Sequence, residues 1–136
     1  MKRLINPASM APPLANYSHA ITVSCPETWL FASGQLGVAL DRQIPDDIEA
    51  QCILCFENLR TILTEADMSF ENVVRFNAFV TDRAFFGPYG KVRERYVSGA
   101  GFASTLAIVS GFTRPEFKIE VEITAVRAIG DFPQDE

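Results

Sequence analysis

The sequence predicts an α+β domain in which two helices pack on one face of a mixed β-sheet. Segments with strand periodicity and segments with helical periodicity follow one another in the order β, ββ, α, β, α, ββ, which is typical of that architecture. The chain has 136 residues, of which 48% are apolar, and this is enough to fill one hydrophobic core. We therefore expect one domain over residues 1–136.

The first third of the chain contains three predicted strands. Residues 2–5 form a short first strand, and a proline-rich connection follows it. Residues 21–23 and 29–37 are predicted to pair as a hairpin. The second strand of this hairpin contains Ser33 and Gly34, and a glycine there indicates a bulge or the close approach of another group to the backbone. This strand end is a candidate wall of a binding site.

Residues 46–66 carry the strongest helical signal in the chain. Apolar side chains recur there in steps of four and three, which is one stripe of an α-helix. Asp46 follows a proline and precedes Glu49 by three residues, a spacing that resembles a capping box. Cys52 and Cys55 belong to the stripe, and their spacing also suits half a metal site or a redox pair. A zinc site needs four ligands, however, and the chain offers only one further cysteine and one histidine, so we favour core packing.

The next two segments add a strand and a second helix. Residues 73–80 are apolar and β-branched, which predicts a central strand that is buried on at least one face. Residues 82–98 have aromatic and apolar side chains at helical spacing, although Gly87 and Pro88 disturb the first turns. The helix is expected to end at the glycine-rich residues 98–101.

The last two strands, residues 102–109 and 117–126, are predicted to pair with each other through a longer loop. In the second of them, a period of two puts apolar side chains on one face and Glu120 and Glu122 on the other. The helices leave this second face open. An open sheet face in a domain of this size must be solvated or must meet another chain, so we expect oligomerisation.

The overall charge excludes some classes of partner. The net charge is −5, from 12 basic and 17 acidic residues, and no basic stripe is available to neutralise a phosphate backbone. Nucleic acid is therefore not an expected partner. No apolar run approaches the roughly twenty residues of a membrane span, and the N-terminal residues lack the apolar core of a signal peptide. We expect a soluble, cytoplasmic protein.

Four segments in register resemble one known family. They are residues 16–20, the Ser-Gly-Gln at 33–35, the helical Glu-Asn-Leu at 57–59, and the Lys-Ile-Glu-Val-Glu at 118–122 with Ala-Val at 125–126. In this order and spacing they resemble the RidA family, the YjgF/UK-type reactive-intermediate deaminases, over about residues 5–127. The resemblance implies a chorismate-mutase-like fold and a homotrimer with a central barrel. It also implies small-molecule clefts at the subunit interfaces, and hydrolysis of imines and enamines without a metal or cofactor.

Four positions of this sequence match residues that line the cleft in such proteins. Tyr17 matches the tyrosine of the family's Pro-Tyr-Ser segment, and Ser33 and Gly34 match the strand end at the cleft. Glu120 matches the glutamate that holds the attacking water. The resemblance therefore assigns Glu120 as a catalytic residue and the other three as substrate-binding residues.

Three positions depart from the family pattern. The family's deaminases have an arginine that grips the substrate carboxylate, and this position is Ala103 here; Tyr89 replaces an asparagine of the second helix, and His19 replaces a glutamine. Without the arginine, an incoming α-carboxylate would be desolvated and unpaired. A substrate that is neutral or carries its charge elsewhere is expected, unless Arg75 or Arg114 compensates from another position.

Each candidate role has a plainer alternative. Glu120 acts as a general base toward water, or it is a solvated or ion-paired strand residue with Lys118 two positions away on the same face. His19 protonates a leaving amine or is a hydrogen-bonded wall residue. The hydroxyls of Tyr17 and Tyr89 donate to a substrate or belong to interface aromatics.

Thr105 shares strand parity with Ala103, so both are expected to face the cleft.

Two functions remain at this point. One is a cofactor-free hydrolase of a C–N bond, and the other is a trimeric binding or regulatory protein that has lost the chemistry. Ribonuclease activity has been attributed to some relatives, but the acidic balance argues against it here.

Overall fold

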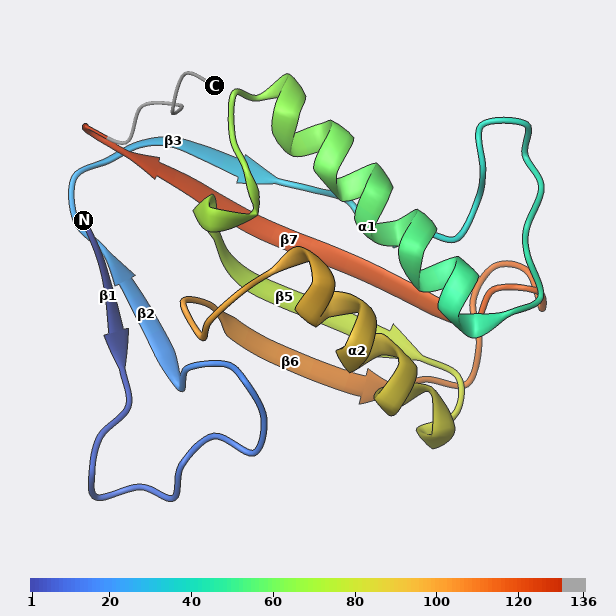
Figure 1. The fold of residues 1–136 in the computed structure, drawn as a ribbon, viewed down its shortest axis with the longest axis horizontal. Helices are drawn as coiled ribbons and strands as arrows, with labels where there is room; N and C mark the ends of the chain where they lie inside the picture. Colours follow the sequence, from blue (N-terminus) through green and yellow to red (C-terminus); the bar gives the residue numbers. More distant parts are fainter. Residues whose placement is uncertain (131–136) are drawn as a thin grey trace.

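The computed structural model describes residues 1–130 and confirms the predicted α+β class, with two helices on one face of a mixed sheet (Figure 1). The elements are the strands β1 Lys2–Ile5, β2 Ala20–Val23, β3 Pro26–Phe31, β4 Gln35–Leu36, β5 Val73–Val80, β6 Ala103–Ile108 and β7 Ile119–Ala128, the helices α1 Ile48–Glu65 and α2 Phe86–Tyr96, and the 3₁₀ turns Phe70–Asn72 and Arg83–Phe85. Within the described residues, no helix has the length and apolar character that crossing a membrane requires.

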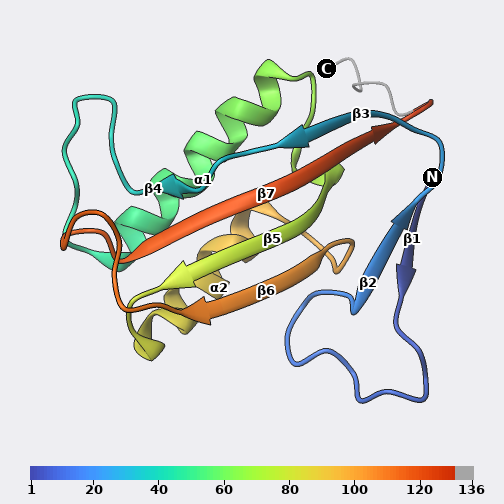
Figure 2. The same cartoon turned by 180° about the vertical axis from the view of Figure 1, so that it is seen from behind.

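The main sheet has five strands in the order β3-β7-β5-β6, and the short β4 pairs with the first part of β7. Strands β5 and β6 are parallel, and the pairs β5–β7 and β3–β7 are antiparallel. Strands β1 and β2 form a separate two-stranded antiparallel sheet. Figure 2 shows the main sheet from the side that neither helix covers. We call this side the open face.

Both predicted hairpins are wrong in their pairing, although their strands exist. Strands β6 and β7 do not pair with each other, because β5 lies between them. Strand β2 pairs with β1, and β3 pairs with β7. Parallel strands need a crossover, and α2 supplies it between β5 and β6. Side-chain periodicity specifies which face of a strand is buried, but it carries no information about the neighbouring strand.

Helix α1 begins one residue later than the predicted capping box implies. Its N-cap is Asp47, whose Oδ2 accepts a hydrogen bond from the backbone N of Ala50 at 3.0 Å. Asp46 instead offers its backbone carbonyl to Nζ of Lys118. Two adjacent aspartates satisfy the capping signal equally well in sequence. The extended backbone of Asp47, with φ −72° and ψ 130°, is what makes it the cap.

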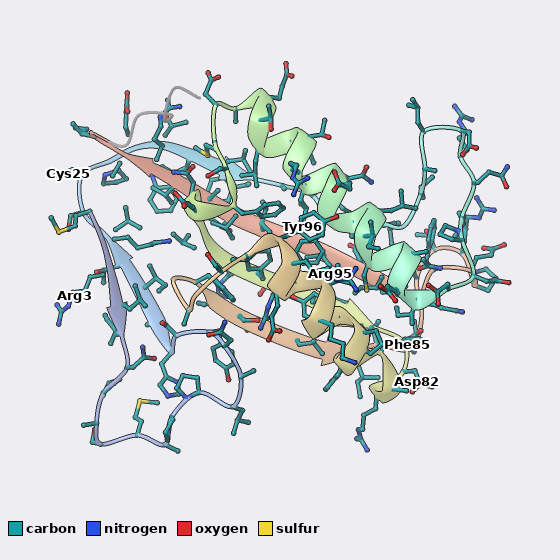
Figure 3. All side chains as sticks on the ribbon, viewed as in Figure 1. Arg3, Cys25, Asp82, Phe85, Arg95 and Tyr96 are labelled. Carbon is teal, nitrogen blue, oxygen red and sulfur yellow. The ribbon has the colours of Figure 1, made fainter. Side chains whose placement is uncertain are left out.

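The core lies between the two helices and the sheet. The predicted stripe of α1 is buried there, and the alternation predicted for the last strand is confirmed, with its apolar side chains facing the helices. Phe56 of α1 contacts the rings of Phe76, Tyr89 and Tyr96, with centroids 5.2 to 6.2 Å apart. Tyr96, labelled in Figure 3, also donates a hydrogen bond of 2.8 Å to Glu57 and so joins α2 to α1.

The cysteines of α1 are part of this core. Cys52 and Cys55 are fully buried, and the thiol of Cys55 donates to the backbone carbonyl of Gln35 at 3.2 Å. Burial raises the pKa of the Cys52 thiol to about 12, so the thiolate that metal binding and redox chemistry need is disfavoured. Cys25 is exposed at the turn between β2 and β3 (Figure 3). Over residues 1–130, no cluster of three His, Cys, Asp or Glu side chains is placed to hold a metal ion.

Candidate functional site

Five of the predicted site residues fall into two groups on one chain. The first group, Ser33, Gly34 and Glu120, lies where β4 pairs with the start of β7. The second group, His19, Ala103 and their neighbours, surrounds Thr124 further along β7. Thr124 lies four positions after Glu120, which is about 13 Å along a strand. One chain therefore does not bring the two groups together.

Glu120 is held against Gly34. Leu36 of β4 pairs with Glu120 of β7, so the preceding Gly34 lies beside the carboxylate. A β-carbon placed on Gly34 would lie only 1.9 Å from Oε1 of Glu120. The half-buried carboxylate thus occupies space that only a glycine leaves free. The sequence signal at 33–35, a glycine at a strand end, pointed to this close approach.

The carboxylate of Glu120 makes no hydrogen bond or ion pair with the part of the chain that the structure describes. Lys118, the partner in the plainer alternative, instead donates to a carbonyl of the α1 start, and its Nζ lies 6.0 Å from the ring centroid of Phe85. Glu122 differs, because its Oε1 accepts from Nδ2 of Asn77 at 2.9 Å. Of the two carboxylates on this strand face, Glu120 is the one available to bind water or a ligand.

The second group is built by the segment that precedes β2. The backbone N of Ser18 donates to the carbonyl of Phe102 at 2.9 Å, and the hydroxyl of Ser18 donates to the carbonyl of Ala100 at 2.5 Å. The backbone N of His19 donates to Oδ1 of Asn6 at 2.9 Å. The two Ser18 bonds attach the His19 segment to the residues just before β6, beside Ala103, and the bond to Asn6 attaches it to the end of β1.

The result is a hollow of about 270 Å³ at the edge of the open face. Three strand positions in register form its floor, because Arg75 of β5 pairs with Ala103 of β6 and with Thr124 of β7. The complete lining is His19, Ala20, Ile21, Val74, Arg75, Ala103 and Thr124. The predicted site residues His19 and Ala103 therefore do share one cavity.

The imidazole of His19 has a defined tautomer. Its Nε2 lies 2.7 Å from the carbonyl oxygen of Ala11. A carbonyl can only accept, so Nε2 carries the hydrogen. Neutral His19 then presents Nδ1 as an acceptor, and it can donate a second proton only as imidazolium. The geometry suits both a wall residue and a proton donor.

Tyr17 and Tyr89 are placed differently from each other. Tyr17 is half-buried beside the core, and its hydroxyl accepts from the backbone N of Leu14 at 3.4 Å. Tyr89 is expected from the resemblance to line the cleft, but only 1% of it is exposed, and its ring lies in the core against Phe56. Burial raises the pKa of this phenol. Tyr89 belongs to the apolar positions of the second predicted helix, and this helical spacing already indicated a core residue. Its position in the core agrees with the spacing and not with the proposed match to an asparagine that lines the cleft.

The remaining candidates lie apart from the hollow. Thr105 is exposed on β6 opposite Asn77 of β5, so it shares the open face with Ala103, as its parity predicts. The backbone carbonyl of Ser33 accepts from Gln35 at 3.0 Å. Arg114 lies in the β6–β7 loop and pairs with Glu116 at 3.4 Å.

Sequence reasoning missed one supporting residue, Arg93 of α2. It is 7% exposed, and its guanidinium donates to the hydroxyl of Ser104 at 3.2 Å and to the carbonyl of Asn16 at 3.4 Å. The same group lies 5.1 Å from the ring centroid of Phe102. Arg93 thus links α2, the start of β6 and the segment before β2. In the sequence, Arg93 directly follows Val92, an apolar position of the second predicted helix. This placement could have indicated that Arg93 faces inward.

Comparison with known proteins gives one consistent family. The profile of the endoribonuclease L-PSP family matches residues 8–127. Protein DfrA of Myxococcus xanthus is 33% identical, over 81% of this chain and 84% of its own length. The 2-iminobutanoate/2-iminopropanoate deaminase of Mus musculus is 27% identical, over 89% of this chain and 85% of its own. The crystal structure of YyfB, a conserved Rid-family protein of unknown function from Yersinia pestis, is 26% identical. It superposes with a TM-score of 0.82, covering 93% of this chain and 98% of that one.

Proposed function

Since this chain belongs to the endoribonuclease L-PSP family, which includes the Rid and YjgF proteins, we propose that it is a cofactor-free hydrolase of an imine, an enamine or a related C–N bond. The observation that carries this proposal is the carboxylate of Glu120, held against Gly34 and unpaired among residues 1–130. Relatives named as deaminases of 2-imino acids or of reactive intermediates support the same class of reaction.

In the proposed reaction, Glu120 acts as a general base. It accepts a proton from water while the water oxygen bonds to the electrophilic carbon of the C=N group. The nitrogen takes up one proton as the carbinolamine forms and a second before the C–N bond breaks. The carbinolamine hydroxyl releases its proton as the carbonyl forms, so both protons of the water end on the ammonia that leaves. His19, with a proton on Nδ1, is the proposed donor to the leaving nitrogen.

The complete cleft is proposed to form between copies of the chain. Within one chain the Glu120 group and the His19 group lie at separate places along β7, so a second copy must bring one group toward the other. Two aromatic side chains on the open face support such contacts. Trp29 and Phe31 are 51% and 76% exposed, and their rings stack with centroids 6.2 Å apart. We propose a homotrimer whose open faces meet in a central barrel.

The substrate is proposed to have no α-carboxylate bound at residue 103. Ala103 presents a methyl group where the family's deaminases have a guanidinium, so a carboxylate there would have no bidentate partner.

A second candidate function follows from the same residue. It is a trimeric protein that binds a small molecule at the cleft, for ligand storage or regulation, without turnover.

Substitution of Glu120 distinguishes the two functions. Imines generated in place by an amino-acid oxidase or dehydratase are offered with and without an α-carboxylate, and semicarbazide competes for them. The hydrolase predicts that Glu120→Gln lowers turnover by about 10²- to 10⁴-fold while the fold is kept. Glu122→Gln is the matched control, since Glu122 is bonded to Asn77. Absence of turnover of every imine by the unmodified protein would exclude the hydrolase and favour the binding protein.

The family name also suggests cleavage of RNA, which the charge does not favour. At a net charge of −5 the chain lacks the excess of basic residues that typically neutralises a phosphate backbone. Absence of RNA binding at low salt, where such binding is strongest, would support this exclusion.

A further inference from the structure

We propose that Arg75 binds the carboxylate of a small organic acid in the hollow beside Ala103. This proposal deepens the proposed function. It rests on that function in one respect, because it takes the acid to be part of the substrate. The hollow itself is tested by binding alone. Arg75 of β5 would thus bind the negative charge of the substrate, in place of the arginine that the family's deaminases have at the position of Ala103 on the neighbouring strand β6.

Arg75 is placed and available for this role. It lies on the open face of β5, where its neighbours in register are Ala103 and Thr124. Its side chain is exposed and makes no hydrogen bond or ion pair with residues 1–130. Glu122, two residues before Thr124 on the same face, does not pair with it, because Glu122 accepts from Asn77. The planar guanidinium fork of Arg75 is therefore free for an external carboxylate.

The hollow has the size and lining for a short acid. Its volume is about 270 Å³, which is close to the lower end of the range for small-molecule sites. Ala20, Ile21, Val74 and Ala103 contribute apolar wall, whereas Arg75, the Thr124 hydroxyl and the His19 imidazole are the polar groups. A few polar groups in an apolar wall are typical of small-molecule sites. The short side chain of Ala103 leaves this space open beside Arg75.

Two other arginines, Arg93 and Arg114, are already engaged. Arg114 is in an exposed loop and pairs with Glu116. Arg93 is buried and donates to Ser104 and Asn16. Neither one lines the hollow, so Arg75 is the better candidate for the carboxylate.

The position of Arg75 also restricts the substrate. Neighbouring strands are about 4.8 Å apart, so Arg75 would hold a carboxylate displaced by about that distance from one bound at residue 103. An imine or enamine whose carboxylate is separated from the reacting carbon by additional carbons fits this displacement.

The test uses His19 as a reporter. His19 is the only histidine of the chain, so a tag-free protein gives a single set of imidazole NMR signals from the wall of the hollow. Butyrate is titrated at constant ionic strength, and butyramide, which has the same shape without the charge, is titrated in parallel. We expect a saturable shift of the His19 signals with butyrate and at least tenfold weaker binding of butyramide.

Variants locate the binding group. Arg75→Gln is expected to weaken butyrate binding by about 10- to 100-fold, with an unchanged far-UV spectrum because the side chain is exposed. Arg114→Gln is the matched control and should bind as the parent does. Glu120→Gln should keep butyrate binding even where it loses turnover, which separates this proposal from the proposed reaction. Equal binding by Arg75→Gln, equal binding of butyramide, or no saturable shift in the parent would each overturn the proposal.

Discussion

At the scale of single residues, the contact between Gly34 and Glu120 leads to a sharp prediction. Gly34→Ala would place a β-carbon 1.9 Å from Oε1 of Glu120, so the flexible carboxylate must move aside. We expect kcat/KM to fall toward the value of Glu120→Gln, by about 10²-fold or more, with little change in the free energy of unfolding. Steady-state kinetics and denaturant unfolding measure the two quantities.

Gly90→Ala is the matched control for that prediction, because a β-carbon at Gly90 would have nothing within 4 Å apart from its chain neighbours and the backbone of its own helix. It is expected to leave kcat/KM unchanged and, within α2, to stabilise the fold by about 0.4–1 kcal/mol. A Gly34→Ala protein with the activity of the parent would show that the position of the Glu120 carboxylate does not matter for turnover.

The site residues were predictable from the sequence to different degrees. Glu120 and Gly34 could be paired in advance only through the family resemblance, since 86 positions of sequence separate them and no local pattern joins β4 to β7. The opposite holds for Tyr89, whose helical spacing indicated the core. Arg75 remained one of two open alternatives, because the strand register that places it beside Ala103 is a long-range property.

At the scale of elements, helix α1 is the best test of the core. Leu59 is fully buried on the stripe that faces the sheet. We expect Leu59→Ala to lower the free energy of unfolding by about 2–5 kcal/mol, because transfer free energy is lost and a cavity remains. Glu65→Ala, at the exposed end of the same helix, is the control and should change stability by less than about 0.5 kcal/mol. Urea unfolding of both variants measures the difference, and a small effect at Leu59 would mean that this core can collapse around the gap.

The elements were mostly predictable, and their pairing was not. Helix α1, strand β5 and the buried face of β7 follow from local periodicity, which hydrophobic burial enforces residue by residue. The pairing of β7 with β5 and β3 depends on the α2 crossover, because α2 carries the chain from β5 to β6 and leaves the other edge of β5 to β7. Both features together produce the open face, on which the free arginine and the free carboxylate lie.

At the scale of the whole molecule, the trimer prediction depends on the open face. Three chains of 15.1 kDa would sediment as a particle of about 45 kDa. Phe31→Glu places a charge where the exposed, stacked ring of Phe31 is proposed to meet another copy. We expect this variant to sediment as a monomer with native secondary structure, since Phe31 contributes little to the core of its own chain.

The same variant also tests whether the cleft needs a second copy. If the Glu120 group of one chain works with the His19 group of another, the folded Phe31→Glu monomer must lose turnover even though both groups are intact. The control is Leu40→Glu, which changes a fully exposed side chain in the loop between β4 and α1. It should leave both mass and turnover unchanged. An active Phe31→Glu monomer, or a parent protein that sediments as a monomer, would contradict the proposed assembly and require each chain to hold a complete site.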